Sequence, residues 1–291
     1  MKKILITGSN GQVGNALRET LLGLKDVECY FASRTDIDIC NRKSLEAARD
    51  NFEPDYVINC AAYTAVDKAE SDEKNAFSVN TDALKLIAET FAKAKIIHFS
   101  SDYVYHASAG PSIRESQATR PQGIYAVSKR DGERVLRACH KNSMVIRTSW
   151  VYHHTGHNFV KTMLRLGREK PSLTIVDDQV GAPTYAMDIA ALVTSIVGSD
   201  MKHPYPTEVW NDTYNFSNEG EITWFAFAEA IKSETPDFSA QLIPVSTAFY
   251  GAPAARPPYS VLSLDKIKGT FSVEIRSWKS SLRDCLSRIN V

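Results

Sequence analysis

A tyrosine and a lysine, Tyr125 and Lys129, form the pair in this sequence best suited to acid–base chemistry. They stand four positions apart, so a helix would place both side chains on one face, one turn apart. A free phenol has a pKa of about 10, and we expect the nearby ammonium to lower that of Tyr125 toward neutral pH. Such a pair arises by chance in many chains. It predicts a general acid only if a cofactor and a carbonyl substrate lie beside it.

A hydroxyl group upstream could complete the pair. Residues 96–100 read as a strand, and Ser100 and Ser101 stand at its end, where catalytic groups of parallel sheets gather. The Ser101 hydroxyl could bond a carbonyl oxygen as negative charge develops there. A serine at a strand end also commonly bonds local backbone groups, so this second interpretation stays open.

A glycine-rich turn follows the first predicted strand. Glycines at positions 8, 11 and 14 separate residues 3–7 from a helical pattern. Glycine allows a tight turn and close approach to a pyrophosphate, which the N–H groups of the helix N-terminus then bind. A turn without a ligand is the alternative. We expect cofactor contacts at Gly8, Asn10, Gly11, Gln12, Val13 and Gly14.

The end of the second predicted strand indicates which dinucleotide is used. An acidic residue about 20 positions after the turn would favour NAD, but the count from Gly14 reaches Arg34, preceded by Ser33. A guanidinium and a hydroxyl suit a 2′-phosphate. The sequence therefore favours NADPH, with NADH left open and a solvated surface arginine as the alternative. Asp38 and Ile39 are expected to flank the adenine.

Alternating strand and helix patterns predict the scaffold for these groups. Short apolar runs at 3–7, 27–32, 56–60, 96–100 and 144–147 read as strands, and residues 72–93 read as an amphipathic helix. This alternation predicts an α/β protein with a doubly wound, Rossmann-like parallel sheet. Residues 1–150 should form the dinucleotide-binding domain, with returning segments near 174–190 and 212–232. Residues 151–291 should be mainly a smaller C-terminal substrate-binding cap. One helix is expected to begin after Thr223, and a last helix carries Leu282, Cys285, Leu286 and Ile289 on one face.

Composition excludes several classes of protein. The 291 residues carry 34 basic and 34 acidic side chains, so a nucleic-acid partner is not expected. No apolar run approaches the length of a membrane helix, which is about 18 residues. Five scattered cysteines are expected to be reduced thiols. We expect a cytoplasmic protein.

Several segments together carry a family resemblance. They are the glycine turn, residues 59–70, 101–105, 147–152, 158–166 and 178–184, the Tyr125 and Lys129 pair, and Arg256 with Pro257. Over nearly the whole chain the sequence resembles the extended short-chain dehydrogenase/reductases, and within them the dTDP-4-dehydrorhamnose reductases. The resemblance implies NADPH-dependent reduction of the 4-keto group of dTDP-4-dehydro-L-rhamnose to dTDP-L-rhamnose, in nucleotide-sugar biosynthesis.

The resemblance also implies residue roles. Tyr125 would be the general acid, Lys129 would lower its pKa and bind the nicotinamide ribose, and Ser101 would stabilise the developing charge. Further cofactor contacts would be Cys60, Ala61, Ala62, Tyr63, Asn80, Ser100, Tyr125 and Lys129, with Asn80 ordering the site. The dTDP-linked 4-keto-6-deoxy sugar would meet Thr64, Val66, Ser101, Asp102, Tyr103, Trp150 and Arg256.

Other interpretations remain. Related dehydratases carry a glutamate where this chain has Tyr103, which argues against dehydration. A non-catalytic NADP-binding subunit, like the regulatory subunit of methionine adenosyltransferase, is an alternative, and so is a reductase or epimerase of another nucleotide-linked 4-ketosugar. The loop at 108–116 departs from the family pattern and leaves sugar choice open.

No metal site is expected. Three histidines, His153, His154 and His157, lie close together but without helical ligand spacing. Some family members join two subunits through magnesium, yet Ala16 and Met187 stand where their glutamates would be. We therefore expect a monomer or a weak homodimer.

Overall fold

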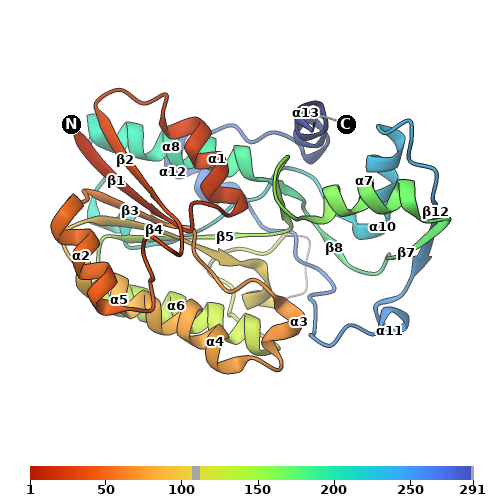
Figure 1. Cartoon of the computed structure of the whole chain (residues 1–291), viewed down its shortest axis with the longest axis horizontal. Helices are drawn as coiled ribbons and strands as arrows, with labels where there is room; N and C mark the ends of the chain where they lie inside the picture. Colours follow the sequence, from red (N-terminus) through yellow and green to blue (C-terminus); the bar gives the residue numbers. More distant parts are fainter. Residues whose placement is uncertain (107–111, 290–291) are drawn as a thin grey trace.

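A six-stranded parallel sheet forms the centre of the molecule (Figure 1). The computed structural model describes residues 1–106 and 112–289. The sheet has the order β10-β5-β4-β3-β1-β2, and every neighbouring pair is parallel. Its strands are β1 (Lys2–Thr7), β2 (Val27–Ala32), β3 (Tyr56–Asn59), β4 (Lys95–Ser101), β5 (Ser143–Thr148) and β10 (Thr213–Asn215). The five strands predicted from apolar runs are confirmed, each within one residue at either end.

Helices cover both faces of this sheet (Figure 1). On one face lie α1 (Gln12–Leu21), α8 (Ala186–Lys202) and α12 (Asp265–Phe271), and on the other lie α2 (Arg42–Phe52), α5 (Ala83–Thr90) and α6 (Ile124–Cys139). Alternate residues of β1 therefore enter different cores: Ile4 and Ile6 pack with α1 and α8, while Leu5 packs with α2 and α5. The doubly wound α/β fold is confirmed.

The helix expected over residues 72–93 contains a π-helical turn that the sequence pattern did not indicate. It consists of α4 (Glu73–Phe77), the π-helical η1 (Ser78–Asp82) and α5. Such turns within helices are rare and frequent at functional sites. Here the turn contains the buried Asn80.

The remaining elements build the cap, to the right in Figure 1. Three two-stranded sheets pair β6 (Val151–Tyr152) with β9 (Thr184–Tyr185), β7 (Ser172–Val176) with β12 (Gln241–Val245), and β8 (Val180–Gly181) with β11 (Ile222–Thr223). They pack with α7 (Phe159–Glu169), α10 (Trp224–Ser233) and α13 (Trp278–Arg288) around an aromatic-rich core. Thr223 caps α10 as predicted, because its hydroxyl accepts the Ala226 N–H at 3.1 Å.

The segments that return to the sheet differ from those expected. From the stretch near 174–190, only the part beginning with α8 at Ala186 joins the sheet domain, since β7 pairs with β12 in the cap. From the stretch near 212–232, β10 joins the sheet, whereas α10 packs on α7 in the cap. An apolar run predicts that a strand exists but not which strand it will pair with.

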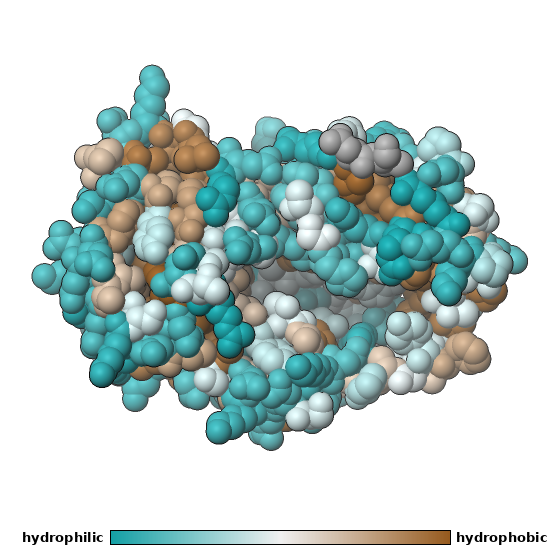
Figure 2. All heavy atoms as spheres, in the orientation of Figure 1, coloured by the Kyte–Doolittle hydropathy of each residue, from teal (hydrophilic) through white to brown (hydrophobic). Residues whose placement is uncertain are grey.

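Short helices complete the fold: α3 (Val66–Ala69), the 3₁₀ turn η2 (Asp102–Tyr105), α9 (Thr207–Trp210) and α11 (Thr247–Tyr250). The five cysteines are free thiols, as expected. Within the described residues, no helix is both long and apolar enough to span a membrane. Figure 2 shows a hollow between the sheet domain and the cap.

Candidate active site

A cavity of 710 Å³ opens where the sheet strands end and the cap begins. This is the size range of small-molecule sites. Most residues predicted to contact cofactor or substrate line it: Gly8, Asn10, Gly11, Gln12, Val13, Arg34, Asp38, Ile39, Cys60, Ala61, Ala62, Tyr63, Thr64, Val66, Ser100, Ser101, Asp102, Tyr103, Tyr125, Lys129 and Trp150. The carboxyl ends of parallel strands and the glycine turn therefore meet in one place.

The glycine turn lies under one end of this cavity. Gly8 has φ +65°, and a Cβ there would lie 2.5 Å from the Ala61 nitrogen, so only glycine fits. Gly14 does not line the cavity; a Cβ there would lie 2.6 Å from the Gly8 oxygen, so it serves close packing of α1 under the turn. No side chain caps the N-terminus of α1 at Gly11. These features fit a dinucleotide, because free helix N–H groups bind a pyrophosphate.

The groups expected at the adenosine end are only partly brought together. Arg34 is exposed at the cavity with Asp38 and Ile39 beside it. Ser33 does not line the cavity, and its hydroxyl donates to the Asp36 carboxylate at 2.6 Å. Arg34 is thus the group available for a 2′-phosphate.

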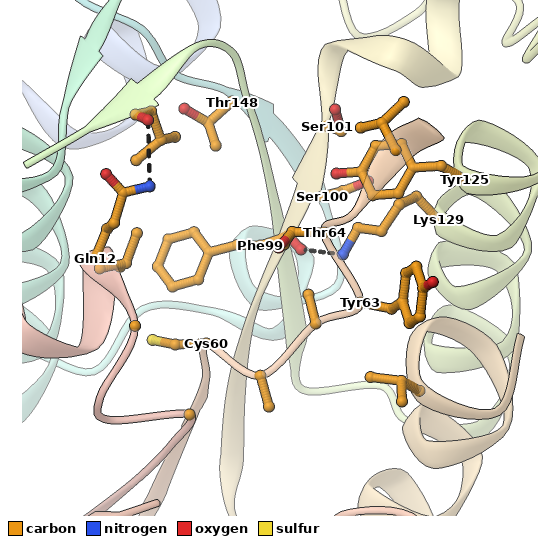
Figure 3. A pocket seen from close by; sticks show the side chains of 18 of the residues that line it. Gln12, Cys60, Tyr63, Thr64, Phe99, Ser100, Ser101, Tyr125, Lys129 and Thr148 are labelled. Atoms are coloured by element: carbon orange, nitrogen blue, oxygen red, sulfur yellow. Dashed lines mark hydrogen bonds between the residues drawn. The ribbon is translucent and has the colours of Figure 1, made fainter. Parts of the chain in front are cut away.

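Tyr125, Lys129 and Ser101 converge on the sheet side of the cavity (Figure 3). Tyr125 and Lys129 extend from the first turns of α6, and Ser101 is the last residue of β4. The Lys129 ammonium group donates to the Phe99 carbonyl at 2.7 Å, which fixes the direction of its long side chain. The Tyr103 ring meets the Tyr125 ring edge-on, with centroids 5.5 Å apart.

The pKa values of this trio differ from the expectation in one respect. Burial raises the pKa of Tyr125 to about 12, although the Ser101 hydroxyl opposes the rise. The prediction of a lowered tyrosine pKa is therefore wrong for this structure, because desolvation of the phenolate outweighs stabilisation by neighbouring groups. Burial lowers the pKa of Lys129 to about 8. At neutral pH both groups hold their protons, which is the state a proton donor needs.

Asn80 positions the site from behind and does not line the cavity. In η1, its amide oxygen accepts the Tyr63 N–H at 2.9 Å, and its amide nitrogen donates to the Tyr63 carbonyl and the Ser128 hydroxyl, both at 3.1 Å. These bonds join the loop after β3 to α6. The ordering role implied by the resemblance fits this geometry, whereas direct cofactor contact does not.

The sugar side of the cavity is formed by the cap and by η2. Trp150 has φ +48° and stacks on Trp224, with ring centroids 3.6 Å apart. Asp102 is buried next to Ser101, whose hydroxyl donates to it at 3.0 Å, and burial raises the pKa of Asp102 to about 6. Arg256 lies outside the cavity lining and pairs with Asp67 at 2.7 Å. Residues 108–111 of the 108–116 loop lie outside the described residues.

Some lining residues were not anticipated from the sequence. They include Phe99, Thr148, Val151, Gly156, His157 and Trp224. Phe99 and Thr148 could have been found, because they stand at the ends of predicted strands. Trp224 and His157 carry no local signal, since only folding of the cap brings them to the cavity.

The rings of His153 and His154 lie together, with centroids 3.9 Å apart. His157 lines the cavity, while Nε2 of His153 and of His154 lie 3.9 and 3.2 Å from a carboxylate oxygen of Glu19. Nδ1 of His153 accepts the Thr155 N–H at 3.1 Å, so the proton of the neutral ring is on Nε2. That nitrogen then has no lone pair for a metal. The grouping with Glu19 is accordingly not a preformed metal site.

The parallel sheet and the tyrosine–lysine pair define an oxidoreductase of the short-chain dehydrogenase/reductase class, because a proton donor and a glycine turn line one cavity at the strand ends. Comparison with known proteins narrows the class. The chain belongs to the family described as RmlD substrate binding domain, whose model matches residues 1–291.

Individual relatives agree with this family. The chain is 34% identical to the dTDP-4-dehydrorhamnose reductase of Aggregatibacter actinomycetemcomitans, over 98% of each protein. Its fold matches the crystal structure of a dTDP-4-dehydrorhamnose reductase from Clostridium acetobutylicum with a TM-score of 0.92 and 34% identity, covering 99% of this chain and 100% of that one. It also matches the Bacillus anthracis dTDP-4-dehydrorhamnose reductase in complex with NADP, with a TM-score of 0.89, 33% identity and 99% of each chain covered.

Proposed function

We propose that this protein reduces the 4-keto group of dTDP-4-dehydro-L-rhamnose with NADPH, giving dTDP-L-rhamnose. The observation that carries the proposal is the convergence of Tyr125, Lys129 and Ser101 on a cavity whose other end is the glycine turn. The choice of substrate is supported by the family match and by the similarity to dTDP-4-dehydrorhamnose reductases. The NADP complex of the Bacillus anthracis relative supports the cofactor.

The residues present suit each part of such a reduction. Bound NADPH would supply the hydride that adds to C4 of the sugar. Tyr125 would donate its proton to the former carbonyl oxygen, so a hydride and a proton together convert the ketone to an alcohol. The raised pKa of Tyr125 keeps this proton in place at neutral pH. The Ser101 hydroxyl would stabilise the charge on that oxygen as it develops.

Lys129 would act before and after the proton transfer. Its ammonium group faces the cavity from α6 and would hold the nicotinamide ribose. Once Tyr125 has lost its proton, the same positive charge would favour the phenolate. Arg34 would bind the 2′-phosphate, and the free N–H groups of α1 the pyrophosphate.

A dehydratase activity is disfavoured by the chemistry of Tyr103. This phenol occupies the place of the dehydratase glutamate, and burial and Asp102 raise its pKa. It therefore cannot serve as a base at neutral pH.

The test follows NADPH absorbance after purified protein is mixed with NADPH and dTDP-4-dehydro-L-rhamnose. We expect consumption of NADPH and formation of dTDP-L-rhamnose, with slower turnover for a GDP-linked ketosugar. Binding of NADPH without turnover, with the sugar intact, would instead indicate the non-catalytic NADP-binding role. A monomeric or weakly dimeric state and a cytoplasmic location stay predictions.

A further inference from the structure

A chain of buried polar side chains runs behind Lys129, on the side away from the cavity. It passes from Thr7 on β1 through Asn59 on β3 and His98 on β4 to Lys129 on α6, and each of these residues is at most 2% exposed. Thr7 bonds Asn59 at 2.6 Å, Asn59 bonds His98 at 3.0 Å, and His98 faces Lys129 at 3.4 Å. Since Thr7, Asn59 and His98 are buried and do not line the cavity, the direction of each hydrogen bond constrains the next.

The orientation of the Asn59 amide can be assigned from its surroundings. The Ala61 backbone N–H, which can only donate, lies 3.2 Å from the Asn59 Oδ1, and the Thr7 hydroxyl donates to the same oxygen. The oxygen therefore faces Ala61 and Thr7. The Asn59 NH₂ group must then face His98 and donate to it.

This donation fixes the tautomer of His98. Its Nδ1 accepts from the Asn59 NH₂ group, so Nδ1 carries no proton. Burial, followed by the charge of Lys129, holds the pKa of His98 well below its usual range, so the ring is neutral. Its single proton is consequently on Nε2, and the Nε2–H group faces the Lys129 nitrogen.

The two ionisation states of Lys129 respond differently to this N–H group. A neutral amine has a lone pair that can accept the His98 Nε2–H while one of its own hydrogens bonds the Phe99 carbonyl. An ammonium has no lone pair, so its positive charge meets the positive end of the N–H dipole. His98 therefore stabilises the neutral amine relative to the ammonium.

Other charged and titratable groups near Lys129 also affect the balance between its ammonium and amine forms. Glu133, one turn further along α6, favours the ammonium. Arg147 on β5 binds both carboxylate oxygens of Glu133, at 2.9 and 2.5 Å, and so weakens that effect. Tyr125 on α6, Asp102 on η2 and Cys60 after β3 line the cavity that Lys129 enters. Among these groups His98 is the one whose hydrogen points at the lysine nitrogen.

We propose that His98 is a positioning residue. Its Nε2–H group stabilises the neutral amine of Lys129 with the lone pair turned away from the cavity, and so the Lys129 ammonium gives up a proton more readily. In the ammonium form, one N–H bond of Lys129 meets the Phe99 carbonyl, and the others would be available to the ribose of bound NADPH and to Tyr125. After Tyr125 has given its proton to the substrate, Lys129 would return a proton to the phenolate and would itself be reprotonated by water entering the open cavity. This role in turnover rests on the proposed reductase function, whereas the tautomer of His98 and its effect on Lys129 do not.

The first experiment reads the tautomer directly. Two-dimensional ¹H–¹⁵N NMR of the full-length protein, with His98 assigned by loss of its signals in His98→Gln, distinguishes a ring protonated on Nε2 from one protonated on Nδ1. We expect the Nε2–H tautomer between pH 6 and 9. A ring protonated on Nδ1, or on both nitrogens, would overturn the proposal even if the protein is an active reductase.

The second experiment measures Lys129 itself. In protein labelled with ¹³C at lysine Cε, the Lys129 signal, assigned with Lys129→Met, is titrated in the wild type and in His98→Gln. The amide oxygen of the introduced glutamine can accept from the ammonium, so we expect the pKa of Lys129 to rise by about one unit, a tenfold change in the ionisation constant. An unchanged titration in a variant that retains the wild-type circular dichroism spectrum would contradict the proposal.

A matched control is His140→Gln. His140 is also buried, but its Nε2 faces the Phe91 carbonyl, away from the cavity. This variant should leave the Lys129 titration unchanged. If the wild type turns over, the alkaline limb of its kcat profile should shift upward in His98→Gln only; equal shifts in both variants would indicate a general loss of packing and count against His98.

Discussion

The sheet side of the cavity holds its polar groups by buried hydrogen bonds, whereas the cap side presents stacked aromatic rings. On the sheet side, the Lys129 ammonium group is held by the Phe99 carbonyl at 2.7 Å. On the cap side, Trp150 lies on Trp224 at 3.6 Å. The Gln12 amide is among the groups that join the two sides, donating to the Val151 carbonyl at 3.3 Å.

This difference indicates a division of labour. Proton transfer requires hydrogens held in fixed directions, which a sheet supplies because its strands are rigid and their ends coincide. Selection of a sugar requires a shaped surface, which rings supply with little conformational freedom. Changes on the sheet side should therefore reduce the rate of the chemical step, and changes on the cap side should affect sugar binding.

Tyr125→Phe should give the largest effect. It removes the proton donor and keeps the ring, so we expect kcat to fall by about 10²- to 10⁴-fold. The affinity for NADPH, measured by fluorescence titration, should change little. Tyr30→Phe, an exposed tyrosine on β2, is the control. Retention of most turnover by Tyr125→Phe would remove this residue from the mechanism.

Ser101→Ala should have the next largest effect. Loss of a hydroxyl aimed at a developing oxyanion costs about 10²-fold in kcat, which steady-state kinetics can measure. Ser101→Thr keeps the hydroxyl and should keep most of the activity. An alanine variant as active as the wild type would mean that the hydroxyl only bonds Asp102 and the local backbone.

Arg34→Ala tests the cofactor end of the sheet side. A charge-assisted bond contributes about 1.5–3 kcal/mol, so the Kd for NADPH should rise by roughly 10- to 100-fold at low salt. The Kd for NADH, measured in the same way, should stay nearly constant because it has no 2′-phosphate. Equal losses for both cofactors would contradict the assignment of Arg34.

Trp224→Ala should have the smallest effect and the opposite pattern. Removing one ring of the stack takes away about 0.5–1.5 kcal/mol beyond buried area, so the KM for the sugar should rise several-fold. NADPH affinity should be unchanged. A fall in NADPH affinity with an unaltered KM for the sugar would show that the two sides are not separable in this way.

The sheet side was largely predictable from sequence, because its signals are local. An apolar run, a glycine turn and a four-residue spacing each determine a strand, a tight bend or a shared helix face without reference to distant residues. The coincidence of strand ends then brings Ser101 beside Tyr125. The family resemblance added the expected sugar contacts Thr64, Val66 and Asp102, which do line the cavity.

The remainder depends on non-local contacts. No periodicity reveals the π-helical turn that holds Asn80, since it adds one residue to a helix that otherwise looks regular. The raised pKa of Tyr125 reflects burial by the complete fold. Arg256 was expected to contact the sugar, but its guanidinium is paired with Asp67 on α3, which is 189 residues away in the sequence. Trp224 reaches the cavity only because α10 packs in the cap.

The backbone of Trp150 has a consequence for redesign of sugar preference. Its left-handed conformation is strained for a bulky residue, and its indole also contacts the place where a Gly181 side chain would begin. Among substitutions there, only glycine would relieve that strain, because any residue with a Cβ keeps it, and every smaller residue would also remove the ring that stacks on Trp224. Thr64 and Val66, which extend from the rigid sheet domain, are better starting points for an altered specificity library.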